Sequence, residues 1–170
     1  MIENEKSEYR TGIGTDIHKL TAERKLVLAG VSVPYSAGLL GHSDGDVALH
    51  AVIDALLGAA AMGDIGTLFP DTDPQLKDID SKQLLTNVKQ RLEEKKWEVV
   101  NVDLIIHVEQ PKLDQFKGQM KRCIAELLGI DFTSVNVKAK TNEGLGTVGT
   151  NQAIAATATT LLRKKQRRTL

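Results

Sequence analysis

Apolar and polar residues follow two different spacings along the chain, and each spacing predicts one type of element. Strict alternation predicts strands, because successive side chains of a strand point to opposite faces. Apolar residues three or four positions apart predict amphipathic helices. We therefore expect four strands, at residues 9–18, 25–33, 100–108 and 135–139, and four helices, at residues 46–62, 81–96, 113–127 and 151–164.

Residues at the ends of these segments add detail to the prediction. The two early strands are short and flank polar breaks, so we expect them to pair as a hairpin. Ser43 and Asp44 are candidate N-caps for the first helix, and Ser81 is one for the second. Gly129 is placed to end the third helix. The fourth helix is rich in Ala and Thr and would depend on packing, because Thr is a middling helix former.

The order of these elements predicts an α/β sandwich, in which a mixed β-sheet packs against helices. The 170 residues, 41% hydrophobic and 26% charged, fit a single domain. We expect a structured core at about residues 10–163, between tails at residues 1–9 and 164–170. The basic run at residues 163–168 suits nucleic-acid binding, but the solvated end of a helix explains it more simply.

Charge and cysteine content narrow the choice of partners and compartment. Lys and Arg together number 22, as do Asp and Glu, so a zero net charge gives no support for a nucleic-acid or membrane partner. The most apolar stretch, residues 47–62, is too short to span a bilayer. Cys123 is alone, and residues 1–10 lack the apolar core of a secretory signal. We therefore expect a cytoplasmic protein.

Three of the four histidines lie in the first third of the chain, beside several carboxylates. Asp16 and His18 are two residues apart on a predicted strand, so both side chains can face one ion. His50 would add a third ligand and leave a fourth tetrahedral position open, as in catalytic zinc sites. Asp54, one helical turn further on, is a candidate acceptor for the other ring nitrogen of His50. Alternatively, Asp16 caps a turn and both histidines are polar residues near the core.

Three further polar segments are candidates for substrate contacts. His42 lies before the first predicted helix, whose N-terminal N–H groups favour an anion, but it also fits a surface turn. The acidic loop at residues 64–73 suits ribose hydroxyls or a second metal, or is a solvated turn. The third segment lies at the end of the last predicted strand and comprises Lys138, Lys140, Thr141 and Glu143. The glycines after it would allow an anion to approach the backbone amides, but the segment also fits an ordinary strand end without a ligand.

Gly12 and Gly14 invite comparison with a dinucleotide-binding fingerprint. That motif, G-x-G-x-x-G, needs a third glycine, and position 17 is Ile. We therefore reject a dinucleotide site at this strand.

Four blocks of sequence, taken together, match a known pattern in order and spacing. They are G-x-G-x-D-x-H at residues 12–18, GLLGHSDGDVALH at 38–50, GDIGTLFPDTD at 63–73 and VNVKAKTNE at 135–143. With these blocks the chain resembles the 2-C-methyl-D-erythritol 2,4-cyclodiphosphate synthase family, from about residue 10 to residue 163. The second and third blocks are long enough to be highly specific.

The resemblance implies roles for individual residues. Asp16, His18 and His50 would bind zinc, and Asp16 and His18 would also contact substrate. Glu143 would hold a second divalent ion, magnesium or manganese, on the CDP phosphates. His42 and Thr141 would serve catalysis. The implied substrate contacts are His42 and Ser43 for the methylerythritol phosphate, Asp64 and Gly66 for ribose, Phe69, Pro70, Asp71, Thr72 and Asp73 for the methylerythritol pocket, Pro111, Lys112 and Leu113 for cytosine, and Lys140, Thr141, Asn142 and Glu143 around the phosphates.

The implied reaction converts 4-diphosphocytidyl-2-C-methyl-D-erythritol 2-phosphate into the cyclic 2,4-diphosphate and CMP, in non-mevalonate isoprenoid synthesis. The substrate's own 2-phosphate attacks the β-phosphate, which fits a sequence with metal ligands but no Ser and His nucleophile pair. The resemblance also implies a homotrimer with each active site at a subunit interface. The cytidylyltransferase domain of some fused relatives is not part of this sequence, so we expect only the cyclisation step.

The chain departs from the family pattern after Gly146. Many members have an aromatic residue and then an Arg there, where this chain has Thr147 and Thr150. In the family, this region is associated with a cavity on the trimer axis that accepts prenyl diphosphates. We therefore expect weak or no prenyl diphosphate binding. A smaller departure, Glu109 and Gln110 before Pro111, would spare cytosine contacts made by backbone groups.

Two other functions remain open on the sequence. A zinc phosphodiesterase would use metal-bound water to hydrolyse the diphosphate. A zinc-stabilised trimeric binding protein would have the same ligands and no turnover.

Overall fold

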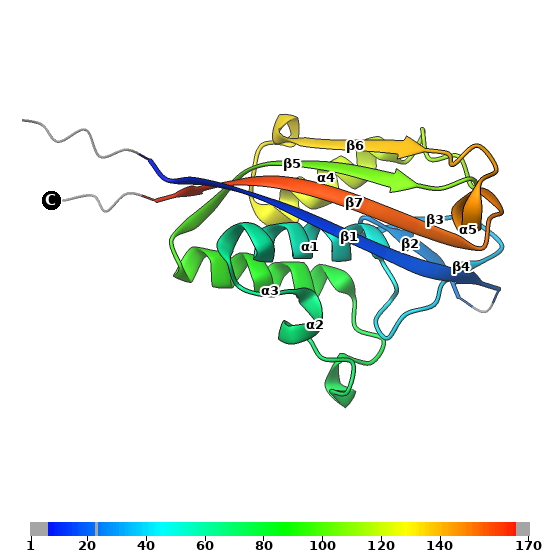
Figure 1. Cartoon of the computed structure of the whole chain (residues 1–170), viewed down its shortest axis with the longest axis horizontal. Coiled ribbons are helices and arrows are strands. Elements are labelled where there is room, and N and C mark those ends of the chain that lie inside the picture. Colours follow the sequence, from blue (N-terminus) through cyan, green and yellow to red (C-terminus); the bar gives the residue numbers. More distant parts are fainter. Residues whose placement is uncertain (1–6, 23, 166–170) are drawn as a thin grey trace, which may run out of the picture.

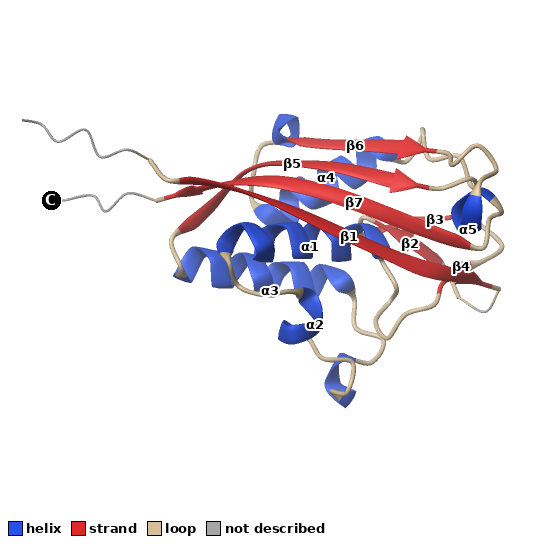
Figure 2. Cartoon of the chain, viewed as in Figure 1, coloured by secondary structure: helices blue, strands red, loops and turns tan. Residues whose placement is uncertain are grey.

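The computed structural model describes residues 7–22 and 24–165. Its main sheet has five strands in the order β4-β1-β7-β5-β6, with helices packed against it (Figures 1 and 2). The strands are β1 (Tyr9–Thr21), β2 (Leu26–Leu28), β3 (Val31–Val33), β4 (Gly38–Leu39), β5 (Trp97–His107), β6 (Val135–Lys140) and β7 (Ala153–Lys164). The helices are α1 (Val47–Ala60), α2 (Ile65–Leu68), α3 (Ser81–Glu94), α4 (Lys117–Leu128) and α5 (Gly146–Gly149), with 3-10 turns at Pro74–Leu76 and Phe132–Ser134.

The predicted mixed sheet is confirmed. β5 and β6 run parallel, whereas β1 pairs antiparallel with β4 and β7, and β7 pairs antiparallel with β5. α1 packs on β1 and β7, and α4 packs on β6. Apolar residues between these layers form a continuous core that excludes water and supplies the main stabilisation of the fold. Within the described residues, no helix is long and apolar enough to cross a membrane.

The predicted helix at residues 151–164 is wrong, because this segment forms β7. Its buried residues recur at every second position, which is the period of a strand: Ile154, Ala156, Ala158, Thr160 and Leu162. The Ala-rich composition favoured a helix, but the small side chains instead let α1 pack on this strand. Arg163 and Lys164 therefore end a strand and not a helix, while residues 166–168 of the basic run lie outside the described residues.

The predicted early hairpin is also wrong in its pairing. β1 does not pair with residues 25–33, which instead form their own two-stranded sheet, β2 and β3. Ala29 and Gly30 connect these strands and have φ angles of 52° and 75°. Two consecutive positive φ angles are typical of tight two-residue hairpin turns, so a turn that sequence periodicity does not reveal divides the predicted strand.

The predicted N-caps of two helices are wrong by one to three residues. Asp46 caps α1 by accepting hydrogen bonds from the N–H groups of Ala48 and Leu49, and Asp80 caps α3 through the N–H of Lys82. The C-terminal prediction is confirmed, because Gly129 ends α4 with a φ of 66°. Asp46 occupies the N–H groups that were expected to bind an anion, so the start of α1 is not a ready anion site.

α1 lies unusually close to β1, at the two glycines that resembled part of a dinucleotide motif. A Cβ at Gly12 would lie 2.0 Å from the backbone oxygen of Ala55, and one at Gly14 would lie 2.1 Å from that of Ala51. Two residues of a strand rise about 6.8 Å and four residues of a helix about 6 Å. Every second residue of β1 therefore meets every fourth residue of α1. These glycines therefore allow a contact between backbones that any side chain would prevent.

We predict that Gly14→Ala lowers the free energy of unfolding by about 1–3 kcal/mol or more, because the new methyl group must push α1 away from β1. Urea denaturation followed by circular dichroism measures the change. Gly118→Ala is the matched control, since a Cβ there meets nothing within 4 Å and α4 continues through this position. Equal stability of both variants would contradict the packing argument.

Candidate metal and phosphate site

Asp16 and His18 on β1 meet His50 on α1, and their ligand atoms converge. Asp16 Oδ2 lies 2.9 Å from His18 Nε2 and 2.9 Å from His50 Nδ1, and the two nitrogens are 3.2 Å apart. Zinc bonds of about 2.0–2.1 Å at tetrahedral angles would separate such atoms by about 3.3 Å. Small outward shifts of the side chains would therefore admit a divalent metal ion.

This cluster is the one group of at least three His, Cys, Asp or Glu ligand atoms that lie within 4.8 Å of one another in the described part of the chain. The predicted convergence of Asp16, His18 and His50 is thus confirmed. Their positions follow from the close contact of β1 and α1, because two residues past Gly14 the strand reaches the helical turn that carries His50.

The electrostatics of the cluster favour a cation. Burial alone would raise the pKa of Asp16, but the hydrogen bond from His18 and the nearby His50 imidazole outweigh burial and hold that pKa well below its usual value. Burial would lower the pKa of His18, but the bond to Asp16 outweighs it and raises that pKa. The carboxylate therefore stays ionised and attracts a proton to the imidazole in the absence of metal. A divalent ion would replace that proton.

The other ring nitrogen of His50 does not contact Asp54, contrary to the prediction. His50 Nε2 lies 3.0 Å from Ser43 Oγ and 3.0 Å from Ser81 Oγ. Asp54 instead accepts a hydrogen bond from the N–H of Ile65 at the start of α2. Spacing on one helix therefore suggested the wrong partner, and the true ones come from a loop and from α3.

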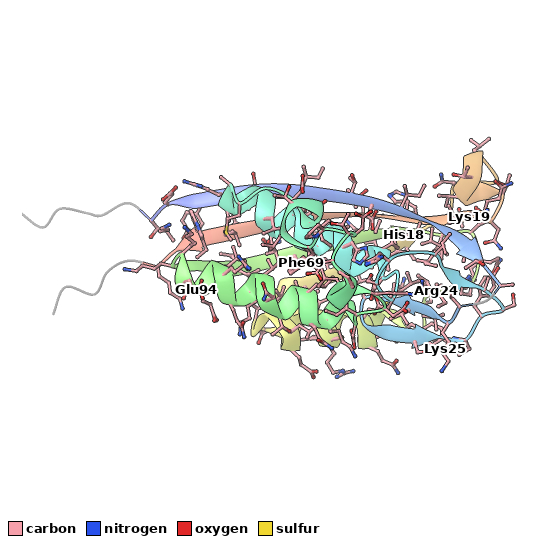
Figure 3. All side chains as sticks on the ribbon, turned by 90° about the horizontal axis from the view of Figure 1, so that it is seen from below. His18, Lys19, Arg24, Lys25, Phe69 and Glu94 are labelled. Carbon is pink, nitrogen blue, oxygen red and sulfur yellow. The ribbon has the colours of Figure 1, made fainter. Side chains whose placement is uncertain are left out.

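The loop that carries His42 and Ser43 is held by Arg24, which the sequence did not single out. Its guanidinium donates to the backbone oxygens of Gly41 and Ser43 at 2.7 and 2.5 Å, and lies 3.7 Å from Asp78. Figure 3 shows the position of Arg24 together with His18 and Phe69. No sequence motif signals this role, because a surface arginine between two strands has many ordinary explanations.

The predicted substrate residues before position 80 lie in the loop before α1 and in the segment from α2 to residue 73. His42 is exposed, and its Nε2 lies 3.5 Å from the backbone oxygen of Asp73. Asp64 caps α2, and its hydrogen bonds with Thr67 lower its pKa. The remaining members of this group are mostly exposed, as expected of residues that meet a ligand: Gly66, Phe69, Pro70, Asp71 and Thr72.

The predicted residues after position 100 form a second group. A cleft of about 170 Å³ is lined by Pro111, Lys112, Leu113, Lys140 and Thr141, together with Val108, Asp114 and Ala139. Next to it, Glu109 Oε2 accepts a hydrogen bond from the N–H of Asn142, and Thr141 Oγ1 donates to Glu143 Oε1 at 2.6 Å. The segments around Pro111 and Thr141 therefore lie side by side.

Within one chain, the predicted substrate residues before position 80 and those after position 100 lie apart from each other. Asp16 pairs with Ala156, Ala156 with Ile106, and Ile106 with Ala139, so they form one row across the sheet. Strands β7 and β5 lie between the first and last members, which places β1 and β6 about 14 Å apart at 4.8 Å per strand. Figure 1 likewise shows α2 and the C-terminal end of β6 on opposite sides of the molecule.

The fold and the cluster define an α/β protein whose candidate metal ligands come from one strand and one helix. Residues 9–163 match the YgbB family, and the chain belongs to it.

Relatives and solved structures agree with this assignment. The chain is 51% identical over 156 residues to 2-C-methyl-D-erythritol 2,4-cyclodiphosphate synthase of Chlorobaculum parvum, which covers 92% of this chain and 99% of the relative. It is 54% identical over 156 residues, again 92% of the chain, to the bifunctional enzyme IspD/IspF of Albidiferax ferrireducens, of which it spans only 37%. The structure of the Plasmodium falciparum IspF CDP complex superposes with a TM-score of 0.83 at 34% identity, covering 95% of this chain and 100% of that one.

We predict that the purified protein holds about one divalent metal ion per chain, and that Asp16→Asn, His18→Ala or His50→Ala each reduces this to near zero. Each substitution removes one of only three protein ligands. Elemental analysis after dialysis measures the content. His42→Ala is the control, because this neighbouring histidine lies outside the cluster and its loss should leave the metal bound. Full metal content in the His50 variant would rule out the assigned site.

Proposed function

We propose that the chain converts 4-diphosphocytidyl-2-C-methyl-D-erythritol 2-phosphate into 2-C-methyl-D-erythritol 2,4-cyclodiphosphate and CMP. The observation that carries this proposal is the convergence of Asp16, His18 and His50 beside the loop of His42 and Ser43. Metal binding alone would suit many functions. The match to nearly full-length relatives that are named as this synthase selects among them.

The donor set suits zinc, because two imidazole nitrogens and one carboxylate with an open fourth position are typical of catalytic zinc sites. Zinc held by these residues would supply positive charge to stabilise the β-phosphate of the substrate. Glu143 would hold a second divalent ion, magnesium or manganese. Such an ion commonly takes one or two protein carboxylates and completes its shell with substrate phosphates.

The residues of the chain would act mainly by folding the substrate. His42 and Ser43 would hold the methylerythritol phosphate, and the segment from Phe69 to Asp73 would enclose the methylerythritol. An oxygen of the 2-phosphate then forms a bond to the β-phosphorus, and the bond from that phosphorus to the CMP oxygen breaks, with its electron pair leaving on CMP. No base is needed, because the attacking phosphate is already ionised. Orientation of a tethered nucleophile can contribute about 7–11 kcal/mol.

The nucleotide would bind in the second group. Pro111, Lys112 and Leu113 would receive cytosine in the cleft of about 170 Å³, next to Thr141 and the phosphates. The P. falciparum relative was solved as a CDP complex, which supports a nucleotide site in this fold. Asp64 and Gly66 would contact the ribose from the first group.

Two observations support a homotrimer with active sites between subunits. The two residue groups lie on strands about 14 Å apart within one chain, so the second group of a neighbouring subunit would complete the first. The sheet face that points away from α1 also exposes apolar side chains, with 66% of Ile13 and 55% of Ile17 accessible. Burying such a surface would stabilise an assembly.

We expect the wild-type protein to release cyclic diphosphate and CMP in equal amounts, as measured by phosphorus NMR. His50→Ala should abolish turnover and leave a folded trimer. Release of an uncyclised 4-phosphate with CMP would show a phosphodiesterase instead. If no substrate were consumed, and if removal of zinc dissociated or unfolded the trimer, the protein would be a zinc-stabilised binding protein.

The trimer can be tested through its proposed interface. Ile17→Glu should yield monomers with little cyclase activity, because it places a charge in a surface that the assembly buries. Light scattering with size-exclusion chromatography measures the mass. Thr133→Glu serves as a control, since this exposed residue lies in the 3-10 turn before β6, outside the strands of the sheet, and should not change the mass. A wild-type protein that is monomeric at catalytic concentration would contradict the proposal.

We also expect weak or no binding of prenyl diphosphates. The hydroxyl of Thr150 donates to the backbone oxygen of Gly146 at 2.9 Å, so it is engaged within α5, and Thr147 adds no cation. An anion held by neutral hydroxyls in place of Arg loses its charge-assisted bonds. Calorimetric titration with geranyl diphosphate should show no saturable signal, and tight binding would contradict this expectation.

A further inference from the structure

The face of His50 that points away from the metal cluster meets a compact set of polar groups from two segments. Its Nε2 lies 3.0 Å from Ser81 Oγ, and Ser81 is fully buried at the first residue of α3. Ser81 Oγ in turn lies 2.5 Å from Asp44 Oδ1, and the Ser81 N–H donates to Asp44 Oδ2 at 3.2 Å. The chain of contacts therefore runs from Asp44 through Ser81 to His50.

The number of protons determines the direction of each hydrogen bond. A carboxylate only accepts, so the contact between Ser81 Oγ and Asp44 Oδ1 uses the single hydroxyl proton of Ser81. Ser81 Oγ can then only accept from His50, which requires a proton on His50 Nε2. Ser43 Oγ, at 3.0 Å from the same nitrogen, can either accept from it or donate to it, because its own hydroxyl proton is not committed to a carboxylate, so Ser81 is the group that fixes the direction.

The position of this proton matters for the metal cluster. A neutral imidazole has one N–H group, so a proton on Nε2 leaves the lone pair on Nδ1 facing Asp16 and His18. Without a fixed acceptor at Nε2, the proton could move to Nδ1, where Asp16 Oδ2 at 2.9 Å would accept it. That alternative tautomer would block the nitrogen that a metal must use.

We propose that Ser81 and Asp44 are positioning residues, which hold the His50 proton on Nε2 and so keep Nδ1 available as a metal ligand. This inference rests on the metal-binding part of the proposed function, but it concerns two residues that are neither in the metal cluster nor among the proposed substrate contacts. Ser81 is not a helix cap, because Asp80 provides the cap of α3. Its buried hydroxyl instead lies between Asp44 and the histidine.

The test measures zinc affinity by competition with a chromophoric chelator, and needs no turnover. Ser81→Ala should weaken zinc binding about 10-fold or more, because loss of such a supporting hydrogen bond commonly costs 10- to 100-fold. Asp44→Asn should weaken it as well, because an amide group that donates to Ser81 Oγ would turn the hydroxyl proton toward His50. Asp80→Ala is the matched control. It removes the α3 cap next to Ser81 and should lower the melting temperature with unchanged zinc affinity.

Heteronuclear NMR of the zinc-loaded wild-type protein gives an independent readout. We expect a His50 Nε2–H signal that is protected from exchange, and loss of that protection in Ser81→Ala. The inference is overturned if the Ser81→Ala protein keeps that protection, or if both variants bind zinc within twofold of the wild type. If instead zinc affinities follow the prediction while the wild type forms no cyclic product, only the proposed reaction fails.

Discussion

The close contact between β1 and α1 is the constraint on which the site depends. Gly12 and Gly14 leave no side chain between strand and helix, and a methyl group at either position would overlap a helix carbonyl oxygen. The next residues on the same face of the strand are Asp16 and His18. Because the helix lies so near, His50 reaches them across a short gap, and three ligand atoms meet without any long flexible side chain. Every second residue of β1 faces α1, so one strand face carries the packing glycines at its start and the candidate metal ligands further along.

Much of this arrangement could be predicted from the sequence, because it depends on local periodicity. The period of a strand placed Asp16 and His18 on one face, and the helical pattern around His50 was strong. The Ala- and Thr-rich segment of β7 was misjudged as a helix, since its small residues satisfy helix propensity while its partners, β1 and β5, lie far away in sequence. In this segment, pairing with β1 and β5 outweighed the local helix propensity.

Contacts between distant segments account for the parts of the site that the sequence did not reveal. Asp54 was the local choice as partner of His50, yet Ser43 and Ser81 take that place. Ser81 is separated from His50 by 31 positions, and no spacing rule connects them. Arg24 likewise holds the loop before α1 through hydrogen bonds to residues 17 and 19 positions away, which no sequence motif reveals. The family resemblance, in contrast, proposed residues in both groups. The separation of the two groups within one chain is the strongest structural reason to expect a multimeric active site.

The central claim is that a strand and a helix in direct contact build a three-ligand metal centre from Asp16, His18 and His50. X-ray absorption spectroscopy of the zinc-loaded protein tests it most directly, because it reports the ligand types around the metal. The account predicts two imidazole nitrogens at about 2.0–2.1 Å, with oxygen as the remaining ligands at about 2.0–2.2 Å. A sulfur shell at about 2.3 Å, or a shell of oxygen without imidazole, would contradict it.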